Sequence, residues 1–328
     1  MSKSVKIAID AMGGDRGAEV CVPAGLTMLR KHPDLYIAFV GLPDIVQPYL
    51  DAATDVRERA SLVVAQQVVS MDESAADALR KKKKSSLRIA IDLVKSGEAD
   101  ACVSAGNTGA LMATGRFVLK TLPDIDRPAI MASVPTLQGS SLMLDLGASV
   151  DCTAEHLYQF AIMGSVVASQ VEGINNPKVG LLNIGEEDMK GNDTVREAAA
   201  MLTASSLNYI GFVEGSDISQ HKADVVVADG FSGNVALKVM EGTARLILQY
   251  LKDEFGGGIY GKIAGAISLP VLRKLADRLD PRHYNGATLI GLNGIVIKSH
   301  GGADEVAFQR AIKIALIEVE QDVPAKIG

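Results

Sequence analysis

Six short stretches of this 328-residue sequence place glycine beside Asn, Asp, Ser, Thr or His, directly after a β-branched apolar run. They are Asp10–Asp15, Ser104–Gly109, Asp145–Ala148, Asn183–Glu187, Asp229–Asn234 and Ser299–Gly302. Glycine lets main-chain N–H groups come close to a ligand, and a following helix adds the positive end of its dipole. One such turn is an ordinary way to leave a strand. Six of them indicate a crevice that binds phosphate or another oxyanion.

The elements that must position these turns form an alternating pattern. The expected strands are Val5–Ile9, Tyr36–Val40, Ala101–Val103, Ser141–Leu144, Lys178–Asn183, Tyr209–Val213, Val225–Ala228 and Leu289–Lys298. The expected helices include Ala18–Lys31, Leu87–Ser96, Ala154–Glu172 and Thr194–Ser205. Strand–helix alternation predicts an α/β fold with a mostly parallel sheet, whose strand ends would bring the six turns to one edge. We expect one domain over residues 1–328; a split into two subdomains is the alternative for a chain of this length.

Composition narrows the function classes. The chain has 33 Lys+Arg against 39 Asp+Glu, a net charge of −6, with 48% hydrophobic and 22% charged residues. Mild acidity and 4% aromatic residues with no Trp argue against nucleic acid as a partner. The apolar start at Val5–Ile9 is too short for a secretion signal, and no run approaches the length of a membrane span. We expect a cytoplasmic protein that touches a membrane at most from outside.

Motifs for other chemistries are missing or misplaced. The sequence Gly256–Gly261 matches G-x-G-x-x-G, but it follows a helical pattern instead of the strand that a dinucleotide site requires. There is no Walker A and no G-x-S-x-G motif, and the five histidines lack metal-site spacing. Cys21, Cys102 and Cys152 are far apart, which indicates buried thiols in a reducing compartment; Cys102 lies inside an apolar strand and is expected in the core. No metal and no cofactor are predicted.

Several separated motifs together resemble one known family. Ile7–Asp15, Ser104–Ala110, Asp229–Val235 and Gly291–Gly301 closely resemble the bacterial phosphate acyltransferases of phospholipid synthesis. The resemblance spans nearly the whole chain. It implies transfer of a fatty acyl group from acyl-acyl-carrier protein to inorganic phosphate, which gives the acyl phosphate used for glycerol-3-phosphate acylation. It also implies a Rossmann-like three-layer sandwich of the isocitrate/isopropylmalate dehydrogenase-like type, a homodimer and peripheral membrane contact.

The resemblance assigns substrate contact to the glycine turns. The candidate phosphate-binding residues are Asp10, Gly13, Gly14, Asp15, Ser104, Gly106, Asn107, Thr108, Gly109, Asn183, Gly185, Glu187, Gly230 and Gly233. Phosphate is already an anionic nucleophile, so its direct attack on the thioester needs positioning and oxyanion stabilisation without a covalent enzyme nucleophile. Asn107 and Thr108 are alternatively plain N-caps. Asp10 and Asp15 repel phosphate, so they are better suited to orient a lysine or cap a turn.

Four side chains are the candidates for catalysis: Lys190, Asp229, Asn234 and His300. Lys190 would hold phosphate or the oxyanion; its alternative is a solvated lysine paired with a neighbouring glutamate. Asp229 would orient Lys190 or a water, and Asn234 would donate to phosphate; alternatively the two only shape a turn. His300 would donate to phosphate or protonate the leaving sulfur, or else it caps a turn or packs in the core.

Two surfaces suggest partners. The dense basic run consists of Arg80, Lys81, Lys82, Lys83 and Lys84. It suits docking of an acidic carrier protein, although charge runs are often merely solvated. A helical hairpin is expected over about residues 237–282, with an apolar stripe of Ile259, Tyr260, Ile263, Ile267 and Val271 flanked by cations. Such a stripe can lie in a membrane interface, cover a dimer interface, or do both.

Two other functions remain as alternatives. A dehydrogenase of the same fold would need clustered arginines and metal-binding aspartates near the turns, and the sequence shows neither. A non-enzymatic carrier-protein or membrane adaptor would have no use for a phosphate crevice.

Overall fold

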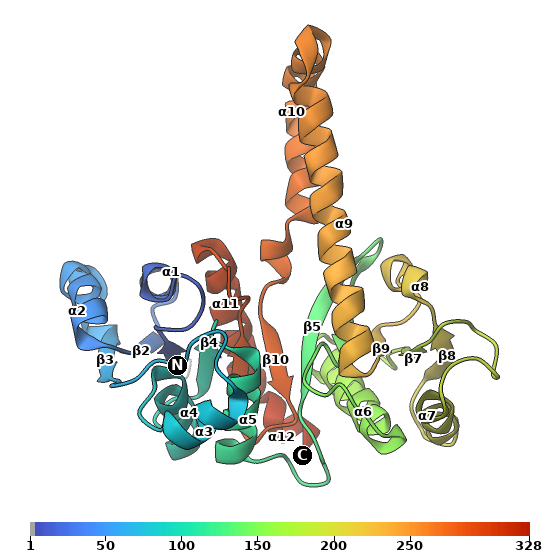
Figure 1. The fold of residues 1–328 in the computed structure, drawn as a ribbon, viewed down its shortest axis with the longest axis horizontal. Coiled ribbons are helices and arrows are strands. Elements are labelled where there is room, and N and C mark those ends of the chain that lie inside the picture. Colours follow the sequence, from blue (N-terminus) through green and yellow to red (C-terminus); the bar gives the residue numbers. More distant parts are fainter. Residues whose placement is uncertain (1–3) are drawn as a thin grey trace.

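The computed structural model describes residues 4–328, and within them eleven strands form one sheet (Figure 1). Their order is β3-β2-β1-β4-β11-β10-β5-β6-β9-β7-β8. The strands are β1 (Val5–Asp10), β2 (Leu35–Gly41), β3 (Ala60–Val64), β4 (Ala101–Ser104), β5 (Ala129–Thr136), β6 (Gly139–Leu144), β7 (Val179–Leu182), β8 (Tyr209–Val213), β9 (Val225–Val227), β10 (Ala287–Ile290) and β11 (Ile295–Lys298). Central strands such as β4 and β9 are buried along their whole length, which explains their continuous apolar sequence.

The sheet is mostly parallel, as predicted, but strand direction reverses at three consecutive pairs in its middle. The three antiparallel pairs are adjacent, β11 with β10, β10 with β5, and β5 with β6. Consequently β6, β9, β7 and β8 run opposite to β3, β2, β1, β4 and β11. The prediction that all six turns share one edge is therefore wrong. The turns after β1, β4 and β11 lie together, and the turns after β6, β7 and β9 belong to the oppositely directed half.

One strand expected from the sequence is two strands in the structure. The run Leu289–Lys298 is split by the turn Gly291–Gly294 into the antiparallel strands β10 and β11. Gly291 has a φ of +90°, a conformation that side chains with a Cβ rarely adopt, so the chain reverses where the sequence read as continuous.

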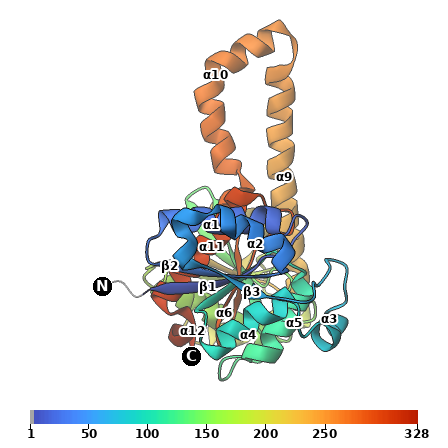
Figure 2. The ribbon, with the colours of Figure 1, turned by 90° about the vertical axis from the view of Figure 1, so that its left-hand side faces the viewer.

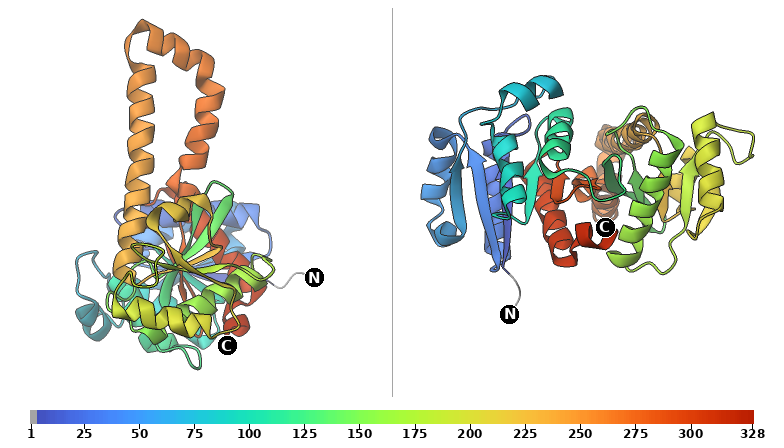
Figure 3. Two further views of the ribbon diagram at one scale, coloured as in Figure 1. Left: turned by 90° about the vertical axis from the view of Figure 1, so that its right-hand side faces the viewer. Right: turned by 90° about the horizontal axis from the view of Figure 1, so that it is seen from below.

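Helices cover both faces of the sheet and complete three layers (Figures 1 and 3). They are α1 (Ala18–Lys31), α2 (Pro43–Ala52), α3 (Ala75–Lys81), α4 (Ser86–Ser96), α5 (Thr108–Leu119), α6 (Ala154–Gln170), α7 (Asp193–Thr203), α8 (Gly215–Gln220), α9 (Gly230–Gly256), α10 (Gly258–Leu279), α11 (Glu305–Gln321) and α12 (Val323–Ile327), with 3₁₀ turns at Thr54–Arg59 and Pro281–Tyr284. The strands β1, β2, β3, β4 and β11 form the first half-sheet, and one core lies between it and the helices α1, α2 and α11. The strands β6, β7, β8 and β9 form the second half-sheet, and another core lies between it and the helices α6 and α7. A third core lies on the other face of the sheet, between the strands and the helices α4 and α5, and it extends to α8 and α9.

The helix α4 shows how the local sequence sets such boundaries. Ser85 precedes it, and the Ser85 hydroxyl accepts the main-chain N–H of Arg88 at 3.3 Å. Leu87 and Ile91 fall on one face and are buried, which drives packing against the sheet. Gly97 ends the helix in the left-handed conformation with φ 76°.

The helices α9 and α10 form an arm that projects from the body (Figures 1 and 2). The prediction of a hairpin is confirmed, and the Gly256–Gly261 sequence lies at its tip after a helix, with Gly258 at φ +58°. Within residues 4–328 no single helix is long and apolar enough to cross a bilayer; α9 and α10 pass that test only together, as a pair bent by 116°. No described side chain of α10 is buried.

Candidate functional site

The turns after β1, β4 and β11 form one hydrogen-bonded group. The Ser104 hydroxyl donates to Asp10 Oδ2 at 2.7 Å, and it accepts the main-chain N–H of Gly106 at 3.0 Å. The main-chain N–H of Asp15 donates to the carbonyl of Gly301 at 2.9 Å. We call these three turns, residues 10–15, 104–109 and 299–302, the turn cluster.

Glycines allow the three turns to meet. A Cβ on Gly13 would lie 2.7 Å from the amide nitrogen of Gly106. A Cβ on Gly14, whose φ is +91°, would lie 2.9 Å from the carbonyl oxygen of Gly301. Both distances are shorter than real side chains tolerate, so larger residues would push the turns apart.

Asp10 is the buried centre of the turn cluster. Burial raises the pKa of its carboxyl group, and hydrogen bonds from the Ser86 and Ser104 side chains and from the main-chain N–H of Met12 oppose that shift. The positive charge of Lys298 also opposes it. Ser86 opens α4, so this helix is tied directly to the cluster.

Asn107 caps α5, as one reading of the sequence proposed. Its Oδ1 accepts the main-chain N–H of Ala110 at 2.9 Å, and its Nδ2 donates to the carbonyl of Met71 at 2.8 Å. The side chain thus fastens the segment before α3 over the turn cluster. The main-chain N–H groups of Thr108 and Gly109 lie in the first turn of α5, where a helix leaves its amides without intrahelical partners.

His300 is exposed beside the same turns. Its Nδ1 accepts the main-chain N–H of Gly302 at 3.0 Å, while its own main-chain N–H donates to Asn285 Oδ1 at 2.9 Å. Burial lowers the pKa of His300, and the positive charge of Lys238 lowers it further. The ring is therefore neutral at pH 7 with its proton on Nε2, which can donate a hydrogen bond.

Lys298 directly precedes the third turn of the cluster, and the sequence analysis did not single it out. Its Nζ donates to the carbonyl of Ala105 at 3.2 Å and also to the carbonyl of Ser299. The sequence carried a signal, because a lysine ends an apolar strand directly before a glycine turn.

The turns after β6 and β9 form a second group at the start of α9. Asp229 caps this helix, accepting the Ser232 main-chain N–H on Oδ1 at 2.8 Å. A Cβ on Gly230 would lie 2.6 Å from the carbonyl of Ser149, and one on Gly233 would overlap the carbonyl of Asp145. Close approach of α9 to the turn after β6 therefore requires both glycines.

Asn234 lies in the first turns of α9 and is exposed. Gly147 lies beside the Asn234 side chain: a Cβ on Gly147 would be 3.7 Å from the Cβ and Cγ atoms of Asn234. One turn further, Lys238 acts electrostatically on both His300 and Lys298. The helix α9 therefore lies between the second group and the turn cluster.

The turn after β7 forms a third group. Asn183 Nδ2 donates to the carbonyls of Gly185 and Lys190, at 3.1 and 3.3 Å. Lys190 is exposed, and its Nζ lies 4.0 Å from Glu187, the pairing that its alternative reading proposed. Within residues 4–328 the structure shows no contact between Lys190 and Asp229.

The basic run Arg80–Lys84 covers the end of α3 and the turn before α4. Lys81 pairs with Asp77 at 2.7 Å and Lys82 with Glu73 at 3.9 Å. The other three cations of the run are exposed, and none has an acidic partner within 4.0 Å among the described residues. The run directly precedes the serine pair that links α4 to the turn cluster.

Groups that resemble a covalent nucleophile are buried. Cys102 has no exposed surface, as predicted, and burial raises the pKa of its thiol far above neutrality. The Ser141 hydroxyl lies 3.1 Å from His221 Nδ1, and His221 Nε2 lies 3.4 Å from Asp224. Ser141 is fully buried, however, and donates to the carbonyl of Ala223 at 2.7 Å. This serine joins neighbouring segments and cannot meet a substrate.

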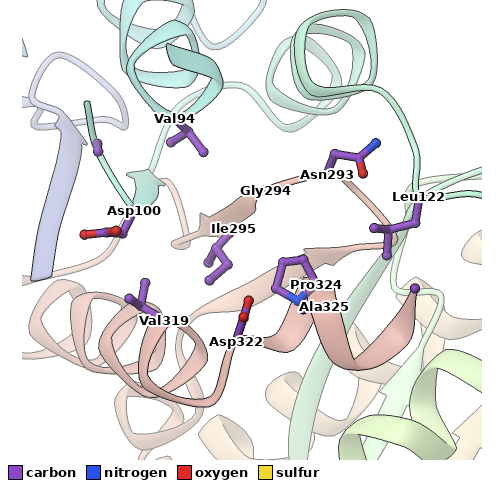
Figure 4. A pocket seen from close by; sticks show the side chains of 12 residues that line it. Val94, Asp100, Leu122, Asn293, Gly294, Ile295, Val319, Asp322, Pro324 and Ala325 are labelled. Atoms are coloured by element: carbon purple, nitrogen blue, oxygen red, sulfur yellow. The ribbon is translucent and has the colours of Figure 1, made fainter. Parts of the chain in front are cut away.

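A cavity of about 590 Å³ lies at the opposite edge of the sheet from the turn cluster (Figure 4). Asp100 and Gly294 in its wall precede β4 and β11, whereas the cluster follows these strands. Its charged side chains are acidic, Asp100 and Asp322, and would repel phosphate. None of the predicted site residues lines it.

Comparison with known proteins relates this geometry to a family. The family model described as "Fatty acid synthesis protein" matches residues 5–326. The phosphate acyltransferase of Alkalilimnicola ehrlichii is 58% identical over 328 residues, which cover 100% of this chain and 96% of that protein. The phosphate acyltransferase of Halorhodospira halophila is 55% identical over 330 residues, with coverage of 100% and 96%.

Solved structures show the same fold at low identity. A phosphotransacetylase from Streptococcus pyogenes has a TM-score of 0.64 at 18% identity, covering 96% of this chain and 94% of that one. A branched-chain phosphotransacylase from Enterococcus faecalis has a TM-score of 0.61 at 15% identity, covering 96% and 99%. With the full-length matches to curated relatives, these findings identify an acyltransferase enzyme that belongs to the phosphate acyltransferase family of fatty acid synthesis proteins.

Proposed function

We propose that this enzyme transfers a fatty acyl group from acyl-acyl-carrier protein to inorganic phosphate at the turn cluster. The observation that carries the proposal is the meeting of three glycine turns around a half-buried lysine and a neutral histidine. Main-chain amides, a helix N-terminus and a cation are the groups that bind tetrahedral oxyanions. Membership of the phosphate acyltransferase family supports phosphate as the acceptor.

The proposed step is a direct displacement. A phosphate oxygen attacks the thioester carbonyl carbon, a C–O bond forms, and the C–S bond breaks through a tetrahedral oxyanion. The His300 Nε2–H is suited to donate to that oxyanion or to the departing thiolate. The buried state of Cys102 and Ser141 supports a mechanism without an acyl-enzyme.

Asp229, Asn234 and Lys190 are proposed as the residues of the second half-sheet that face the acyl donor. Asp229 and Asn234 start α9, which also carries Lys238 toward His300. Lys190 lies on the exposed loop after β7, so its action requires that loop to fold onto the bound substrate.

We propose the basic run as the docking site of the acidic carrier protein. Three of its cations are free of acidic neighbours within 4.0 Å among the described residues. The run precedes α4, and Ser86 of α4 bonds to Asp10, so a carrier bound there would lie beside the turn cluster. Charge complementarity would steer its association.

The arm formed by α9 and α10 is proposed as the contact with a second subunit of a homodimer, with a membrane surface, or with both. Ile259, Ile263, Ile267 and Val271 recur every four residues on α10, and each exposes more than half of its surface. A continuous apolar stripe of this kind is stable in water only when something covers it.

The test is a thiol-release assay. Acyl-acyl-carrier protein is incubated with the enzyme with and without inorganic phosphate, and free thiol is followed by a chromogenic reagent. Acyl phosphate is quantified in the same reaction by mass spectrometry, because hydroxylamine trapping would also cleave the thioester substrate. We expect thiol release that requires phosphate, with one acyl phosphate per thiol. Release without phosphate, or none at all, would refute the proposal.

The dehydrogenase alternative finds no support in the site. Within residues 4–328 no group of three or more His, Cys, Asp or Glu side chains is placed to hold a metal ion. An absorbance change at the nicotinamide band with hydroxy-acid substrates would favour it over acyl transfer.

A further inference from the structure

The ammonium group of Lys298 lies where the turn cluster converges. Lys298 ends β11, and its Nζ reaches the carbonyl of Ala105 in the turn after β4 at 3.2 Å. It also donates to the carbonyl of Ser299 in its own turn. An ammonium has three N–H donors. These two carbonyls use two of them, so one remains for a further acceptor.

The charge of Lys298 is only partly balanced by the protein. Within the described residues no carboxylate lies within the 4.0 Å of an ion pair, although Asp10 and Asp15 are near enough to act on it electrostatically. Buried cations are normally paired, because removal from water costs several kcal/mol unless an anion offsets it. An anion bound beside the glycine turns would therefore stabilise the half-buried ammonium of Lys298.

The other charged groups around Lys298 set its titration. The pKa of Lys298 is lowered to about 8; burial is the largest cause, and the positive charge of Lys238 on α9 acts in the same direction. Asp10, Asp15 and the thiol of Cys21 act in the opposite direction. The side chain is thus mostly charged at pH 7 and loses its charge between pH 7 and pH 9.

Asp10 and Asp15 have a natural role in this arrangement. A carboxylate repels phosphate, but it holds a lysine in its charged form. The Asp10 carboxylate accepts the Ser104 hydroxyl and the Met12 main-chain N–H, and among residues 4–328 it forms no ion pair with the Lys298 ammonium.

We propose that Lys298 is the residue that binds the acceptor phosphate of the acyl transfer, with Asp10 and Asp15 as positioning residues that keep it charged. The inference rests on the proposed function and adds the cation that this function requires. Lys190, in contrast, is exposed and lies 4.0 Å from Glu187. The phosphate diester of the carrier's prosthetic group offers the same oxyanion chemistry, and the experiment separates the two.

The experiment compares Lys298→Met, Lys298→Arg and the control Lys313→Met, which removes an exposed lysine of α11. The Michaelis constants for inorganic phosphate and for acyl-acyl-carrier protein are measured separately at pH 7. We expect Lys298→Met to raise KM for phosphate at least tenfold while KM for the carrier substrate stays within twofold. We expect Lys298→Arg to stay within about threefold of the parent, because arginine also donates to phosphate.

A pH profile distinguishes phosphate binding from a merely structural role. In the parent, kcat/KM for phosphate should fall above pH 8 as Lys298 loses its proton. Arginine stays charged at all accessible pH values, so Lys298→Arg should move that fall beyond pH 10. The ionisation of phosphate itself is common to both profiles. Because the arginine variant keeps the positive charge, this arm remains informative if the methionine variant does not fold.

Binding is also measured without catalysis. Inorganic phosphate should raise the thermal unfolding midpoint of the parent and of Lys313→Met, and the shift should disappear in Lys298→Met. An unchanged phosphate KM and an unchanged shift in a folded Lys298→Met would overturn the inference, as would a raised KM for the carrier substrate alone. Failure of the proposed function is distinct: the parent itself would then show no phosphate-dependent thiol release.

Discussion

Glu318 makes the stability of this protein depend on pH near neutrality. It lies on α11 and exposes 6% of its surface. Its Oε1 accepts the Thr288 hydroxyl, and its Oε2 has no hydrogen-bond partner among residues 4–328. Burial raises the pKa of Glu318 from 4.5 to about 7, and the Thr288 hydrogen bond opposes part of that shift.

The sign follows from the raised pKa. The folded state binds the proton more tightly than the unfolded state, so the associated stability is complete below pH 4.5 and is lost as pH rises through 7. The rise of the Glu318 pKa from 4.5 to about 7 corresponds to about 3 kcal/mol. Most of this is lost between pH 5 and pH 8, although the unfolded carboxyl is already mostly ionised at pH 5.

Glu318→Gln removes the ionisation and keeps the shape. Urea unfolding of the parent and the variant is measured at pH 5, 6, 7 and 8. Between pH 5 and pH 8 the difference between their unfolding free energies should grow by roughly 2–3 kcal/mol in favour of the variant. Glu320→Gln is the matched control, since it removes an exposed carboxyl two residues further along α11 and should show no such trend. Parallel pH curves for the Glu318 variant and the parent would refute the reasoning.

Three further predictions test the proposed function. Lys190→Ala should abolish turnover in the thiol-release assay while the free energy of unfolding changes by less than about 1 kcal/mol, as for an exposed loop residue; near-normal turnover would remove this lysine from the mechanism. Lys82→Glu combined with Lys83→Glu should raise KM for the carrier substrate about tenfold at low salt, with a smaller effect at high salt, and a KM that does not change at low salt would contradict carrier docking there. Ile263→Asp combined with Ile267→Asp should release the protein from anionic vesicles in a sedimentation assay, and equal binding by variant and parent would argue against a membrane role of the arm.

The sequence predicted the elements well where their patterns were strong. The helix α1 begins and ends at the expected residues, Ala18 and Lys31, and β8 likewise spans Tyr209–Val213. Both have long or fully apolar patterns. The strands β3 and β5 were not predicted, since β5 (Ala129–Thr136) mixes polar residues and a proline with its apolar ones.

The sequence did not indicate the reversal of strand direction, because the turn between β5 and β6 lacks a recognisable hairpin motif. The chain turns between β5 and β6 through Leu137 and Gln138, with Thr136 paired to Gly139. Two-residue hairpin turns usually contain Asn-Gly or a related pair, and Leu137–Gln138 is not such a pair. Without that signal, parallel pairing throughout was the natural reading.

The candidate site was predicted in part. The turns after β1, β4 and β11 meet as expected, because parallel neighbours bring their ends to one edge. Lys298 was missed because the direction of a strand-end lysine depends on which strand lies beside it. Its carbonyl partner Ala105 is far away in sequence. The roles assigned to the site residues, and a single domain over residues 1–328, stay predictions.

The helix α9 of the arm is long, and the candidate residue Asn234 lies close to the end that joins the body. The helix α9 runs unbroken from Gly230 to Gly256, which is about 40 Å for its 27 residues. Asn234 lies about 6 Å along this helix. If α9 tilts about its start, a 4 Å sway at the tip displaces Asn234 by only about 0.6 Å. A partner bound to the outer end of the arm can therefore move by several ångströms while the groups near the base of α9 keep their geometry.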